Sequence, residues 1–268
     1  MKLALNYSAP AAELVRQSRI AIDLWKCPDW PDMVATARAE HPVYVHFELR
    51  AGSGKLDATD WNRVEGFLIQ TGTPYVNLHL SPRVTDFDAG DLDNADAVIE
   101  HVLRDVRAAT RRFGPERVIV ENGPYQYPEG VAPRPAVDPE VIRRIVHETG
   151  CGFLLDLSHA RITAQQLGMD EHEYVARLPV DRLCELHITG LDYNDHLLID
   201  HMPLRDDDWL AAEWAMACIH AGDWTEPWVV AFEYGGVNSA FQWRSDPAVM
   251  AAQVPRLRTL ATGNGRVA

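Results

Sequence analysis

The chain has 268 residues and a formal net charge of −14, from 25 Lys and Arg against 39 Asp and Glu. Its 47% hydrophobic and 24% charged residues are typical of a globular protein and exclude disordered, fibrous and small disulfide-stapled classes. Because nucleic acids and anionic membranes attract basic surfaces, the acidic balance argues against both as partners. No linker of biased composition divides the chain, so we expect one domain over residues 1–268.

The start of the chain and its cysteines indicate a compartment. The residues before Asn6 are too few for a secretory signal, and no apolar run approaches the roughly 20 residues that cross a bilayer. The four cysteines are scattered without a CxxC pair, which predicts reduced, mostly buried thiols at Cys27, Cys151, Cys184 and Cys218. We therefore expect a cytoplasmic protein.

Short apolar runs alternate with helical patterns along the chain. Eight runs predict strands, at 3–6, 20–25, 43–49, 75–80, 118–121, 153–157, 183–188 and 228–234. Between them, segments such as 93–114, 138–150 and 206–222 begin at Asp and close at Gly, which are the usual start and stop signals of helices. Eight such units in one chain predict an α/β fold of the (β/α)₈ TIM barrel class. An open doubly wound sheet is the alternative, but no GxGxxG follows the first strand.

The last six predicted strands end in residues that bind metals. Catalytic groups of a TIM barrel lie at the C-terminal ends of its strands, so these side chains should converge. Converging carboxylates repel one another unless cations lie between them, and a mixture of imidazole and carboxylate suits zinc, iron or manganese better than calcium or magnesium. The seventh strand also carries Glu185 on the face of His187. The predicted ligands at strand ends are His46, His79, Glu121, Asp156, His159, His187 and Glu233.

The loop after the seventh strand contains two Asp-His pairs. We take Asp200 and His201 as ligands, because the Met-Pro-Leu that follows would pin the backbone beside them, and Asp195 with His196 is the alternative pair. Nine ligands exceed what one ion uses, which predicts two or three ions. The carboxylates expected to bridge these ions and to act in catalysis are Glu121, Asp156 and Glu233.

Five motifs at these positions resemble a known family: EN at 121–122, GCGFLLDLSHA at 150–160, ELHITG at 185–190, LLIDHMPL at 197–204 and FEYGG at 232–236. They are similar to the multinuclear non-heme iron-dependent oxidative enzymes, which are barrels of the xylose isomerase-like superfamily. The order of ligands also resembles endonuclease IV, a trinuclear zinc enzyme of that superfamily. The resemblance to the iron family implies metal ligands at His46, His79, Glu121, Asp156, His187, Asp200 and Glu233.

Two departures from the family pattern concern the third metal position. Ser158 and His159 stand where many members have paired asparagines, which is closer to the endonuclease form. Asp200 and His201 are adjacent, where both families have Asp-x-His.

The resemblance implies an enzyme that uses two or three irons to activate O₂ and oxidise a substrate, such as a cysteine-containing peptide presented by a partner protein. Zinc and manganese are the alternative metals. Three other functions compete with this one. A sugar isomerase or epimerase would need only one divalent ion and about four ligands. A zinc-cluster phosphodiesterase would suffer repulsion between its acidic surface and DNA. A degenerate barrel that serves only as a binding module would have lost several of the nine ligands.

Two segments are expected to shape a substrate pocket, for a peptide or a small molecule. The proline-rich stretch 121–139 directly follows a proposed ligand, and a tryptophan and an arginine follow the last strand. The predicted pocket residues are Asn122, Tyr125, Tyr127, Trp243 and Arg244, the last of which would meet a substrate carboxylate.

Overall fold

The structure is a computed structural model and describes residues 1–82, 95–126, 132–236 and 244–263. The chain divides into two compact units. Unit 1 consists of Met1–Val45 and Glu185–Ala268, and unit 2 is His46–Cys184. The expected single domain over 1–268 stays a prediction.

Unit 1 alternates strands with helices, as predicted. Its elements are β1 (Lys2–Asn6), α1 (Ala9–Arg16), β2 (Leu24–Pro28), α2 (Pro31–Glu40), β3 (Val43–His46, whose last residue belongs to unit 2), β8 (Leu183–Ile188, from Glu185 onward), β9 (Gly190–Asn194), β10 (Leu197–Met202), α8 (Asp206–Ala221), β11 (Val229–Phe232) and α9 (Pro247–Thr262). Five strands lie in the order β3-β2-β1-β11-β8, and the pairs β2-β1, β1-β11 and β11-β8 are parallel. Helix α9 packs against β1 and β11.

A small apolar cluster lies on one face of the unit 1 strands. It consists of Ala4, Leu24, Tyr44, Val229 and Ala231, with Trp228 packed against it. Side chains two residues apart on a strand share a face. Lys26, two residues after Leu24, and Glu233, two residues after Ala231, therefore project from the same side as this core.

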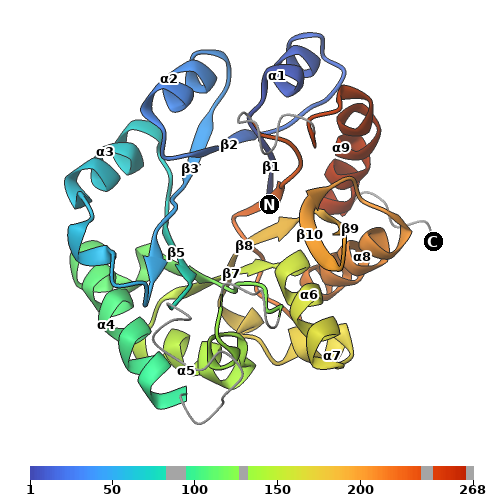
Figure 1. Ribbon diagram of the computed structural model, residues 1–268. Coiled ribbons are helices and arrows are strands. Elements are labelled where there is room, and N and C mark those ends of the chain that lie inside the picture. Colours follow the sequence, from blue (N-terminus) through green and yellow to red (C-terminus); the bar gives the residue numbers. More distant parts are fainter. Residues whose placement is uncertain (83–94, 127–131, 237–243, 264–268) are drawn as a thin grey trace. The chain divides into compact units, whose positions relative to one another are not determined.

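Unit 2 has the same strand-helix alternation. Its elements are β4 (Arg50–Ala51), α3 (Trp61–Thr71), β5 (Val76–Leu80), α4 (Ala95–Phe113), β6 (Val118–Glu121), α5 (Pro139–Thr149), β7 (Gly152–Asp156), α6 (Leu157–Leu167) and α7 (Glu171–Ala176). The strands are parallel, in the order β7-β6-β5-β4, and α4 packs against β5 and β6 (Figure 1). The parallel alternation confirms the predicted α/β class.

The predicted helix signals hold at most of their positions. Asp138 caps α5 by accepting a hydrogen bond from the Glu140 backbone N–H, and Gly150 ends the helix with a φ of +70°. The helix predicted over 206–222 is confirmed, because α8 begins at Asp206 and Gly222 caps its end. Its N-terminal cap is Arg205 rather than an aspartate, and the Arg205 backbone N–H donates to the Asp208 carboxylate at 2.8 Å. The predicted start of the helix at 93 lies outside the described residues.

The second strand begins at Leu24 rather than at Ile20, so its predicted range was wrong. Pairing with β1 sets the register, in which Ala4 lies opposite Leu24 and Asn6 opposite Lys26. Ile20 is buried but lies outside the strand, because hydrophobicity reports burial and not backbone pairing. The shift brings Lys26 into the middle of a strand.

The segment that was expected to be a loop after β8 forms an antiparallel hairpin instead. Strands β9 and β10 pair through Leu197 with Asn194, in a two-stranded sheet of their own (Figure 1). Asp195 adopts a left-handed φ of +55° at the turn, a conformation that Asp tolerates better than most residues. Asp195 and His196 are both exposed.

The described helices include none with the length and apolar character needed to traverse a bilayer. All four cysteines are free thiols, two of them buried and two partly buried, as the sequence predicted. Burial raises the pKa of Cys27 to about 12 and that of Cys151 to about 11.

Thiol labelling tests this arrangement. Because only the thiolate is nucleophilic, Cys27 and Cys151 should stay unmodified by a disulfide reagent at pH 7.5 in the native protein and react fully in urea. Mass spectrometry of digested protein identifies the labelled positions. Rapid native labelling of either cysteine would contradict the buried placement.

Candidate metal centre

Two histidines in unit 2 face one oxygen of Glu121. His79 lies opposite Glu121 in the register of β5 and β6, and its Nδ1 is 3.0 Å from Glu121 Oε2. His46, the last residue of β3, places its Nε2 3.5 Å from the same oxygen. The three residues offer ligand atoms that lie within 4.8 Å of one another, and Glu121 is 2% exposed. This set of two imidazoles and one carboxylate fits a metal ion such as iron or zinc.

The other oxygen of Glu121 faces a second group. Glu121 Oε1 lies 3.8 Å from His159 Nδ1, and that nitrogen lies 3.7 Å from Asp156 Oδ2. Ligand atoms of these three residues again lie within 4.8 Å of one another. Glu121 thus belongs to both groups, which suits a carboxylate that bridges two ions.

Local structure explains why Asp156 and His159 meet. Asp156 ends β7 and caps α6, because its Oδ1 accepts a hydrogen bond from the His159 backbone N–H at 2.8 Å. His159 Nδ1 lies 2.9 Å from the carbonyl oxygen of Asn122, which places the ring proton on Nδ1 and leaves the Nε2 lone pair for a ligand. The Asp-x-x-His spacing is therefore the first turn of a helix.

Two asparagines hold the backbone beside these ligands. The Asn122 amide donates to the Asp156 carbonyl oxygen and accepts from the Asp156 backbone N–H, both at 2.9 Å. Asn77 makes the same pair of bonds to Phe47, the residue after His46, at 2.9 and 2.7 Å. Each side chain thus imitates a strand partner, because its amide supplies a donor and an acceptor on neighbouring atoms.

Unit 1 contains a buried network of charged groups. Glu233 Oε1 forms an ion pair with Lys26 Nζ and lies 3.3 Å from His187 Nδ1. On the other side of the imidazole, His187 Nε2 is 2.8 Å from Glu185 Oε1, which also accepts from the Tyr44 hydroxyl at 2.8 Å. Lys26 was not predicted as a site residue, because its only signal in the sequence is a lysine within an apolar run.

The charges of this network shift its pKa values. Burial lowers the pKa of His187, but Glu233 and the hydrogen bonds to Glu185 and Glu233 outweigh it and raise the value to about 10. Burial raises the pKa of Glu233, but His187, Lys26 and His201 pull it well below the usual range. Without a metal ion, His187 is therefore protonated and Glu233 ionised at neutral pH.

The remaining predicted ligands lie on the hairpin. Asp200 and His201 are half-buried on β10, with Oδ1 and Nε2 3.9 Å apart, and His201 has a φ of +58°. Arg244 donates to the Asp200 carbonyl oxygen at 2.9 Å. Between the two Asp-His pairs, the structure therefore gives the more protected position to Asp200 and His201.

The other four predicted pocket residues have mixed outcomes. Asn122 is fully buried and bonds to the β7 backbone. Tyr125 is 6% exposed and packs with Val98 and Val137 in an apolar cluster. Tyr127 and Trp243 lie outside the described residues.

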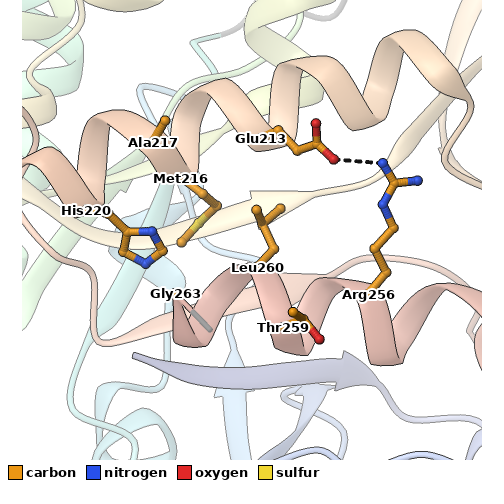
Figure 2. Close-up of a pocket in the computed structure, with 8 residues that line it drawn as sticks. All are labelled: Glu213, Met216, Ala217, His220, Arg256, Thr259, Leu260 and Gly263. Atoms are coloured by element: carbon orange, nitrogen blue, oxygen red, sulfur yellow. Dashed lines mark hydrogen bonds and ion pairs between the residues drawn. The ribbon is translucent and has the colours of Figure 1, made fainter. Parts of the chain in front are cut away.

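A cavity of about 430 Å³ lies elsewhere, between α8 and α9 (Figure 2). Glu213 and Arg256 pair across it at 2.7 Å, and the Arg256 guanidinium lies 3.9 Å from the Trp209 ring centroid. His220, Met216 and Leu260 also line it. Because its single carboxylate is already paired, this cavity lacks the donor set of a metal centre.

Comparison with solved structures identifies the fold. The chain is similar to a xylose isomerase domain containing protein of Salmonella typhimurium, with a TM-score of 0.60 and 15% identity over 97% of both chains. It is also similar to a 3-keto-D-glucoside 4-epimerase of E. coli, with a TM-score of 0.57 and 17% identity over 98% of this chain and 99% of that one. These likenesses confirm the predicted xylose isomerase-like TIM barrel fold.

Two curated relatives share the name UPF0276 protein. A UPF0276 protein of Rhizorhabdus wittichii is 28% identical over 194 residues, which are 69% of this chain and 68% of the relative. A UPF0276 protein of Paraburkholderia phytofirmans is 31% identical over 178 residues, 62% of this chain and 57% of the relative.

A family of peptide-modifying enzymes matches the part of the chain that carries most of the predicted ligands. Residues 25–220 match the family described as RiPP precursor modification enzyme MbnB/TglH/ChrH. The match covers well over half of the 268 residues and agrees with the resemblance that the motifs suggested. The chain therefore belongs to the MbnB/TglH/ChrH family of RiPP precursor modification enzymes.

Proposed function

We propose that the protein is an iron-dependent enzyme that uses O₂ to oxidise a cysteine of a ribosomally made peptide. The observation that carries this proposal is Glu121, whose two oxygens face two separate groups of ligands in unit 2. A pair of ions at these groups would be held by His46, His79, Glu121, Asp156 and His159. The family description, which names precursor peptides, supports a peptide as the substrate.

Iron at such a site supplies the electrons that O₂ accepts, which zinc cannot do. The protein residues fix the ligands. Glu121 belongs to both groups, Asn122 sets the position of Asp156, and His159 Nδ1 donates its proton in a hydrogen bond to the Asn122 carbonyl oxygen. Burial of Glu121 and Asp156 keeps water from competing for their oxygens. A partner protein that presents the peptide completes the proposal.

Metal analysis and one substrate assay test the proposal. Protein made in iron-supplemented medium and purified without oxygen should contain about two irons per chain. With O₂ it should change the mass of a cysteine-containing peptide encoded by a neighbouring gene, and leave the Cys→Ser form of that peptide unchanged. One manganese or magnesium per chain, without iron, would instead favour a sugar isomerase or epimerase. Zinc alone with cleavage of abasic DNA would favour the phosphodiesterase.

A further inference from the structure

Lys26 is a buried cation in the middle of a strand. Its side chain is 7% exposed, and its neighbours Trp25 and Cys27 are fully buried. Moving an ammonium group from water into such surroundings is unfavourable unless a carboxylate pairs with it. Glu233 provides that carboxylate, and its own side chain is 6% exposed.

The Lys26 ammonium and the His187 ring meet at one oxygen. Lys26 Nζ pairs with Glu233 Oε1, and His187 Nδ1 lies 3.3 Å from the same atom. Lys26 shares the face of Leu24 on β2, and Glu233 shares the face of Ala231 at the end of β11. Both side chains therefore project from the side that carries the apolar cluster of unit 1.

A metal ion held by His187 Nδ1 and Glu233 Oε1 would compete with Lys26, which already pairs with that carboxylate oxygen. An ion bound to Glu233 Oε1 would lie beside the Lys26 ammonium group. Two neighbouring cations repel each other strongly where little water is present. The ammonium is also part of the chain, so it fills this position without the entropy cost of capturing an ion from solution.

We propose that Lys26 is the built-in cation of the Glu233–His187 pair and excludes a metal ion from it. This inference rests on the proposed function, because it concerns the number of metal ions that the proposed enzyme binds. The ions lie around Glu121 in unit 2, and the pair in unit 1 takes none. Lys26 is then a positioning residue that neutralises Glu233 and fixes its carboxylate.

Two substitutions at Lys26 test the inference. Lys26→Met removes the charge and keeps much of the length, whereas Lys26→Arg keeps the charge. After anaerobic loading with ferrous iron and desalting, Lys26→Met should contain about one iron more per chain than wild type, and Lys26→Arg the same amount as wild type. Equal iron in Lys26→Met and wild type would overturn the inference. So would a loss of iron, which would mean that Lys26 helps to hold an ion.

Thermal unfolding gives a second measurement if Lys26→Met folds poorly without metal. Lys26→Gln is then the second neutral variant. Ferrous iron should raise the Tm of the neutral variants more than that of wild type, because an additional ion binds only their native state. An equal rise in all proteins would overturn the inference.

The same data separate this inference from the proposed function. The function depends on the iron content of wild type, and the Lys26 inference depends on the difference between variant and wild type. Wild type without iron, together with a Lys26→Met variant that gains an iron, would sink the function and support the inference. In the double variant Lys26→Met/Glu121→Gln, the additional iron should remain.

Discussion

Replacing Glu121 by glutamine is expected to remove both metal ions from the protein. Both ligand groups of unit 2 include this carboxylate, one oxygen each, and an amide neither bridges two cations nor carries their counter-charge. Iron content should fall from about two per chain to nearly none, and peptide oxidation should fall at least 100-fold, of the order seen on losing groups that act in the reaction itself. Elemental analysis of anaerobically loaded protein measures the first effect.

Two further variants serve as comparisons for Glu121→Gln. His79→Asn removes a ligand from one group only and should cost about one iron per chain. Glu65→Gln makes the same chemical change at the surface, where Glu65 pairs with Arg112, and should leave the iron content unchanged. Iron retained in full by Glu121→Gln would rule out the bridged site.

Replacing Glu233 by glutamine should destabilise the metal-free protein by about 3–5 kcal/mol, the usual effect of removing one partner of a buried ion pair. Lys26 and protonated His187 would then remain buried without the carboxylate between them. Urea unfolding of protein treated with a chelator measures the change. Glu226→Gln is the control, because Glu226 pairs with the N-terminus at the surface and its loss should cost less than about 1 kcal/mol.

Adding Lys26→Met to Glu233→Gln should restore part of this loss. The double variant no longer buries an unpaired ammonium group, so the two substitutions should be strongly non-additive. Additive losses would show that Lys26 and Glu233 do not depend on each other.

The pH dependence of stability reports the same network. The ordinary pKa of histidine is 6.5, and in the folded protein that of His187 is raised to about 10. Because the folded state binds this proton more tightly than the unfolded state, the stabilisation is complete below pH 6.5 and is lost as the pH rises to 10. Glu233→Gln removes the main group that raises the pKa, so the unfolding free energy of that variant should decline less over this interval. A steeper decline would contradict the assignment.

Residues at the ends of regular strands were predictable from the sequence. His79 and Glu121 meet because each lies near the end of its strand, and neighbouring parallel strands end at the same edge of the sheet. Asp156 and His159 meet because Asp is a favourable cap and the cap lies one turn from the third residue of the helix. The positions of strand ends and helix caps depend on residues close together in the chain, so a single sequence is enough to predict them.

Features that depend on pairing between distant segments were not predictable. The register of β2 on β1 places Lys26 beside Glu233, whereas hydrophobicity alone favoured a strand that began at Ile20. The β9–β10 hairpin forms across a turn at Asp195, which has no Asn-Gly or Asp-Gly signal. The role of Asn122 also depends on its partner, since its amide bonds to a strand that follows much later in the chain.

Buried thiols have a particular consequence for an enzyme of the proposed kind. A catalyst that oxidises cysteine carries potential substrates in its own chain, and each one exposed as a thiolate would be a route to self-inactivation. Cys27 and Cys151 avoid this, because burial raises their pKa values and leaves no nucleophilic sulfur at neutral pH. The same packing that stabilises the strands thereby protects these two thiols from the chemistry proposed for the protein.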